Sequence, residues 1–89
     1  MKNLIENVCY LSSLDDVDEL HGLFIDVERV YNYDSSLKSV RLRYSFFYEE
    51  GVSYLNFTRE MLESISLEEL KSIVEAHKEK VISSNFRGW

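Results

Sequence analysis

Near Thr58 the hydrophobic period of this chain changes from 2 to 3.6 residues, and this change constrains the fold more than any other feature. Over the preceding residues 23–57, apolar and polar residues alternate, most clearly over 37–48, as expected of strands with one buried face. After it, apolar residues recur at the spacing of an amphipathic helix through about residue 83. The pattern therefore predicts a sheet followed by a long helix, and this helix is the obvious cover for one face of the sheet.

The alternating region divides into strands at positions rich in turn residues. The predicted strands, joined by turns at 34–36 and 49–51, are 23–33, 37–48 and 52–57. Two successive hairpins make an antiparallel meander with the middle strand at its centre. The alternation slips at Arg29-Val30, which indicates a bulge in the first strand.

Charge supports one register for the first hairpin. Pairing its strands across the turn at 34–36 puts Asp26 and Glu28 on the face that carries Arg41 and Arg43. Opposite charges that face each other across a ladder contribute about 0.2–1 kcal/mol each. Because the hydrophobic and charge patterns favour the same register, we expect this pairing.

The N-terminal third predicts two short helices. Residues 2–12 place apolar side chains at helical spacing, although the run from Val8 to Leu11 would also suit the start of a strand. Ser13 stands three residues before Asp16, which resembles a capping box for a second helix over 14–21. Gly22 is a natural helix stop because it readily adopts positive φ.

The sequence thus predicts an α+β fold with two short N-terminal helices, a three-stranded antiparallel meander, and a long C-terminal helix packed on one sheet face. We expect a single domain over 1–89, divided into a helical, acidic part (1–21), the β-meander (23–57), a helical part (59–84) and a tail (85–89). Thr58 and Ser66 are the expected caps of the later helices. The second sheet face is either covered by the N-terminal helices or exposed.

The net charge of −6 is unevenly distributed along the chain. Residues 1–34 hold eight acids against two bases, whereas 35–89 hold eight of each. Phosphate backbones and anionic membranes would repel such a chain, so we expect neither direct nucleic-acid binding nor membrane adhesion. A basic protein would be attracted, mainly through a faster rate of association.

Cysteine usage and hydropathy bear on the compartment. Cys9 is the only cysteine, which excludes an internal disulfide, and its apolar neighbours Val8 and Tyr10 predict a small buried side chain. The sequence has neither a secretory signal pattern nor an apolar run of transmembrane length, so we expect a cytoplasmic protein. Abundant Lys, Asn, Ile and Tyr with little Ala and Gly hint at a bacterial or phage genome.

Catalytic and metal-binding patterns are missing from the sequence. His21 and His77 lie far apart and do not match a zinc site, and the isolated glycines form no phosphate loop. The acidic run from Asp15 resembles a calcium loop only loosely, because it lacks the required glycine. We therefore expect no enzyme activity, no cofactor and no metal. His77 is interpreted as a boundary core residue, and His21 as a partner of Asp18 near a helix end.

Two surfaces remain as candidates for binding a partner. The first is acidic and comprises Asp15, Asp16, Asp18, Glu19, Asp26 and Glu28. The second combines aromatic and arginine side chains on the second sheet face and comprises Phe24, Arg41, Arg43 and Phe47. The tail residues Phe86, Arg87 and Trp89 have a similar character, and Trp89 packing on the domain is the simpler interpretation.

The leading hypothesis is a small acidic regulator or inhibitor that binds a basic-surfaced protein. Its target would be a nucleic-acid-processing enzyme, a toxin or a defence nuclease, and its acids would imitate the charge of nucleic acid. The alternative is a structural module that forms a homodimer, or docks into a larger complex, through its aromatic sheet face. Salt should weaken a complex of the first kind and spare one of the second.

Overall fold

The fold is built on an antiparallel sheet of four strands in the order β1-β2-β3-β4. The structure is a computed structural model that describes residues 2–48 and 51–87. Its strands are β1 (Asp16–Asp18), β2 (Leu23–Tyr31), β3 (Leu37–Phe46) and β4 (Val52–Thr58). Its helices are α1 (Lys2–Ser12), α2 (Arg59–Ser64) and α3 (Leu67–Arg87). The predicted α+β class is therefore confirmed, with one strand more and one N-terminal helix fewer than the sequence indicated.

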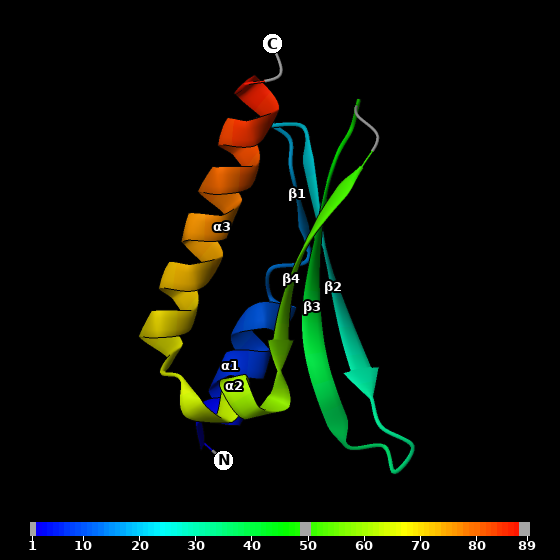
Figure 1. Ribbon diagram of the computed structural model, residues 1–89, viewed down its shortest axis with the longest axis vertical. Helices are drawn as coiled ribbons and strands as arrows, with labels where there is room; N and C mark the ends of the chain where they lie inside the picture. Colours follow the sequence, from blue (N-terminus) through cyan, green and yellow to red (C-terminus); the bar gives the residue numbers. More distant parts are fainter. Residues whose placement is uncertain (1, 49–50, 88–89) are drawn as a thin grey trace.

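All three helices lie on the same side of the sheet (Figure 1). Between the two layers lies a core of side chains that are each at most 8% exposed. It joins α1, α2 and α3 to β2, β3 and β4 through Leu11, Leu62, Leu70, Val74, Leu23, Ile25, Val40, Leu42, Tyr44 and Phe57. Because these strand residues alternate, their neighbours in sequence point to the opposite face of the sheet.

The predicted register of β2 and β3 is correct. Asp26 lies opposite Arg43 and Glu28 lies opposite Arg41, and the expected irregularity falls between Val30 and Tyr31. β3 ends at Phe46 rather than at the predicted residue 48. The two hairpins place β3 between β2 and β4, as the meander requires.

The predicted second helix over 14–21 is wrong. α1 ends at Ser12, and the chain then forms the short edge strand β1, which pairs antiparallel with the first residues of β2. The helix was expected to present Leu14, Val17 and Leu20 on one face, but only Leu14 packs against the core, while Val17 is 42% and Leu20 89% exposed. β1 instead gains backbone hydrogen bonds along the edge of β2. Gly22 keeps its predicted positive φ (63°) but uses it in the turn between β1 and β2.

Side-chain caps define both C-terminal helices. Thr58 Oγ1 accepts a hydrogen bond from the Met61 amide at the start of α2, and Ser66 Oγ accepts one from the Glu69 amide at the start of α3. Both caps were predicted. α3 continues to Arg87, beyond the predicted end at 84, so residues 85–87 extend the helix. The side chains of Phe86 and Arg87, and all of Trp89, lie outside the described residues.

A buried amide ties α1 to the connection between α2 and α3. Asn7 is 0% exposed, and its Nδ2 donates to the carbonyl oxygens of Leu62 (2.9 Å) and Ile65 (3.0 Å). These carbonyls belong to the last turn of α2 and its C-cap, where intrahelical partners run out. Asn7 therefore satisfies groups that burial would otherwise leave unpaired.

Two further expectations concern the surface. Cys9 is exposed, so the prediction that it is buried is wrong. Cys9 lies on the side of α1 opposite the core residue Leu11, because residues two positions apart in an α-helix are separated by about 200° around its axis. Among the described residues, no helix combines the length and apolar character needed to span a bilayer.

Candidate interaction surface

The sheet face opposite the helices is uncovered by any described part of this chain, and we call it the open face. Five large apolar side chains on it are between 37% and 46% exposed: Val17, Phe24, Val30, Val52 and Tyr54. They come from β1, β2 and β4, which cross-strand pairing through β3 brings into one sheet. The open face also carries the charged side chains Asp26, Glu28, Arg41 and Arg43 and the ring of Phe47. The sequence left open whether this face was covered, and the structure shows that no helix packs on it (Figure 1).

An aromatic pair stands at one end of the open face. The rings of Phe24 and Phe47 lie 4.4 Å apart between centroids, with an interplanar angle of 46°. Phe47 is fixed there because its amide donates to the Gly22 carbonyl oxygen at 2.9 Å. A side chain at Gly22 would come within 3.7 Å of the Phe47 ring, so the turn packs closely against it. The pair forms a rigid apolar ridge that remains accessible at Phe24.

Ion pairs occupy the middle of the open face. Arg41 Nε donates to Glu28 Oε2 at 3.1 Å, and its Nη2 contacts the same oxygen. Arg43 Nη1 donates to Asp26 Oδ2 at 3.3 Å. The guanidinium of Arg41 also lies 4.6 Å from the centroid of the Tyr54 ring. The hydrogen bond with Glu28 raises the pKa of Arg41 above its ordinary value. Each arginine is thereby tied to an acid on the neighbouring strand, and Arg41 also lies over the ring of Tyr54.

The six predicted acidic residues do not form one patch. Asp26 and Glu28 lie on the open face in ion pairs, whereas Asp18 faces α3 and contacts Lys78 Nζ at 3.1 Å. Asp18 also accepts from the backbone and ring of His21, in a turn rather than at a helix end. These contacts, led by the hydrogen bond from the His21 ring, lower the pKa of Asp18 to about 2.

The remaining acids line the β1 edge of the sheet. Asp15, Asp16 and Glu19 are exposed and form no ion pair within the part of the chain that the structure describes. Asp15 Oδ2 lies 3.5 Å from the backbone amide nitrogen of Val27. Val27 belongs to the part of β2 that no residue of β1 pairs with. Half of the predicted acidic surface is thus available to a partner, beside the open face rather than on it.

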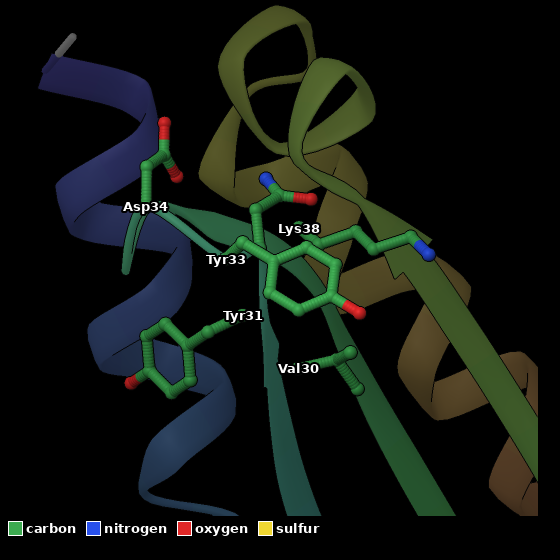
Figure 2. Close-up of a pocket in the computed structure, with 6 residues that line it drawn as sticks. Val30, Tyr31, Tyr33, Asp34 and Lys38 are labelled. Atoms are coloured by element: carbon green, nitrogen blue, oxygen red, sulfur yellow. The ribbon is translucent and has the colours of Figure 1, made fainter.

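A shallow hollow extends the open face at the β2–β3 turn (Figure 2). Its volume is about 550 Å³, and its lining comes from the end of β2, the turn and the start of β3: Val30, Tyr31, Asn32, Tyr33, Asp34 and Lys38. Asp34 accepts hydrogen bonds from the amide and hydroxyl of Ser36, and these bonds lower its pKa. Since Val30 belongs to both, the hollow and the open face form one continuous surface.

A histidine and a serine approach each other beneath α3, but they do not form a catalytic arrangement. His77 Nε2 lies 3.3 Å from Ser53 Oγ, and the His77 ring packs 4.9 Å from the ring of Tyr44. Burial, and then the charge of Lys80, lower the pKa of His77. Burial, with smaller contributions from Tyr10 and Glu75, raises the pKa of Tyr44 to about 12. No described carboxylate hydrogen-bonds to the His77 ring to orient it, as a nucleophile–base pair would need. His77 is thus a boundary core residue, as predicted.

Within 2–48 and 51–87, no three His, Cys, Asp or Glu side chains gather as ligands for a metal ion would. The open face presents aromatic rings, aliphatic groups and paired charges for contact.

Comparison with known protein families, with characterised proteins and with solved structures gives no match for this chain. Its function is therefore argued from its own residues.

The structure brings together the four aromatic and arginine residues singled out from the sequence. Phe24, Arg41, Arg43 and Phe47 all lie on the open face. Sequence reasoning missed Val17, because it placed that residue in a helix, and Val52, whose alternation with Tyr54 in the predicted strand 52–57 was the available signal.

Proposed function

We propose that this chain is a non-catalytic protein-binding module that contacts its partner through the open face. One observation carries the proposal: five large apolar side chains, each more than a third exposed, share one continuous sheet face. Four of them, Val17, Phe24, Val52 and Tyr54, gather at one end of the face, and Val30 lies beyond the ion pairs. An exposed apolar patch bordered by polar side chains typically marks an interaction site. Aromatic and arginine side chains are also the types that dominate contact energies at protein interfaces.

The open face has the layout of an interface with an apolar anchor. Phe24, supported by Phe47, presents a rigid ring that loses little conformational freedom on binding. Arg41 and Arg43 are already paired with acids of their own chain, so a partner need not neutralise them. The aliphatic parts of their side chains can therefore be covered without leaving an isolated buried charge.

A second candidate function is a regulator or inhibitor of a basic-surfaced protein, such as a nucleic-acid-processing enzyme, a toxin or a defence nuclease. The exposed acids Asp15, Asp16 and Glu19 support it, because they stand beside the open face and would steer a basic partner toward it. Charge mimicry of nucleic acid by the full set of six acids has less support, since three of them are paired within the chain. We place either function in the cytoplasm, where the exposed thiol of Cys9 would remain reduced.

Site-specific photo-crosslinking in living cells tests the proposed function. A photoreactive amino acid is placed at Val52 on the open face, at Glu19 on the β1 edge, or at Ile73 on α3, which is 38% exposed. The proposal expects protein adducts from Val52 and none from Ile73. Adducts from Glu19 alone would favour the acidic edge as the contact surface. Adducts from Ile73 alone, or from no position, would overturn the proposal.

A further inference from the structure

We propose that the partner of the open face is a second copy of this chain, docked face to face about a two-fold axis that runs between β2 and β3 and parallel to them. This inference rests on the proposed function, because it names the occupant of the same surface.

The open face is locally neutral. Its two acids, Asp26 and Glu28, are matched by Arg41 and Arg43, whereas the whole chain carries −6. Two copies repel each other through most of their surfaces, and this repulsion is weakest where the local charges cancel. The face that carries five exposed large apolar side chains is thus also a surface on which like copies can meet.

The charges of the open face are arranged so that they complement those of a second copy. The acids lie on β2 and the arginines on β3, in the same two rows across the sheet. A two-fold axis between these strands places β2 of one copy over β3 of the other. Glu28 of one copy then faces Arg41 of the other, and each intrachain pair becomes half of an alternating group of four charges. Such self-complementarity is what an isologous interface requires.

The apolar residues obey the same symmetry. Val17, Phe24, Ser45 and Val52 form one row across all four strands. The two-fold axis turns this row onto its own copy, so that Val17 lies over Val52 and the aromatic pair meets its counterpart. Apolar rows therefore cover apolar rows while charged rows cover charged rows. Two sheets packed in this aligned manner form a β-sandwich with helices on both outer sides.

The size of the face sets the strength of the dimer. Four strands about 4.8 Å apart, with an average length of about seven residues because β1 is short, give a footprint of roughly 450 Å² per copy. Standard interfaces bury about 800 Å² per partner. The dimer is accordingly weak, with a dissociation constant on the order of tens to hundreds of micromolar.

A charge-exchange experiment tests this arrangement on the purified full chain. One variant, D26K/E28K, makes the open face wholly basic, and a second, R41E/R43E, makes it wholly acidic. Each alone brings like charges face to face and should raise the dimer dissociation constant more than about 100-fold. An equimolar mixture should restore dimers, because opposite faces then meet. Sedimentation velocity over a concentration series measures all three, with circular dichroism as the check that each variant is folded.

The matched controls, E68K/E79K and K71E/K80E, make the same changes in net charge on α3. Each control should dimerise with the dissociation constant of the parent, and mixing the two controls should not lower that constant. If the parent stays monomeric up to about 1 mM, if the open-face variants dimerise unaltered, or if the control mixture associates as strongly as the open-face mixture, the dimer is refuted. Adducts from Val52 to a different protein would then leave the proposed function standing, whereas the absence of any adduct would remove both.

Discussion

Replacement of Phe24 by alanine separates the contribution of the open face to binding from its contribution to folding. Phe24 is 41% exposed, and the rest of its surface is covered by its own chain, including the Phe47 ring. A phenylalanine side chain offers roughly 200 Å², so about 80 Å² is available to a partner and about 120 Å² is buried on folding. At about 25 cal/mol per Å², these areas correspond to about 2 kcal/mol in binding and at most about 3 kcal/mol in folding.

Phe24→Ala should therefore raise the dissociation constant of a complex at the open face by about 30-fold. In a symmetric dimer both copies lose the ring, and the increase should approach about 1000-fold. The chain should remain folded, because a domain of this length has roughly 4–13 kcal/mol of stability. Sedimentation equilibrium measures self-association, and titration against any partner captured from Val52 measures binding to that partner. Urea unfolding measures the loss of stability separately.

Ile73→Ala is the matched control, since Ile73 is exposed to a similar extent (38%) but lies on α3. It should lower stability without changing any dissociation constant. If Phe24→Ala leaves association within twofold of the parent while the protein is folded, the ring is not part of the contact surface. The assignment of the open face as the contact surface would then be wrong at Phe24, the residue on which it depends most.

Three further predictions concern the elements that hold the surface in place. Asn7→Ala should cost about 2–4 kcal/mol in urea unfolding, because two carbonyls at the end of α2 lose their buried donor; the exposed Asn56→Ala is the control, and a loss no larger than that of the control would contradict this role. Gly22→Ala should cost about 1–2 kcal/mol because φ is 63° there, and Gly22→Asn should cost less, whereas equal losses would point to contact with Phe47 instead. The pKa of Asp18 is lowered to about 2, so its contribution to stability is complete above its ordinary pKa near 3.8 and is lost as the pH falls through about 2. The stability difference between the parent and Asp18→Asn should shrink over this interval in acid unfolding experiments, and a difference independent of pH would exclude the carboxylate as its source.

Local patterns in the sequence determined most of the secondary structure and one strand pairing. Alternation identified β2, β3 and β4, and the helical period with the caps Thr58 and Ser66 identified α2 and α3. The pairing of Asp26 with Arg43 and of Glu28 with Arg41 followed from charge and hydrophobicity together. These features were predictable because each depends on residues near in sequence or joined by one short turn.

Only the tertiary structure decided what happens between α1 and β2 and which surface stays uncovered. Asp15 to Glu19 carry helix-start signals, but a helix there would have buried little, whereas the unpaired edge of β2 offered hydrogen bonds to β1. Whether helices cover one sheet face or both depends on how the chain packs over long distances, which periodicity does not encode. All three helices share one face, and the other retains Phe24, Val52 and Tyr54 as exposed side chains. The sequence alone thus determined that Phe24, Arg41, Arg43 and Phe47 share the second sheet face, whereas packing added Val17 to it and decided that no helix covers it.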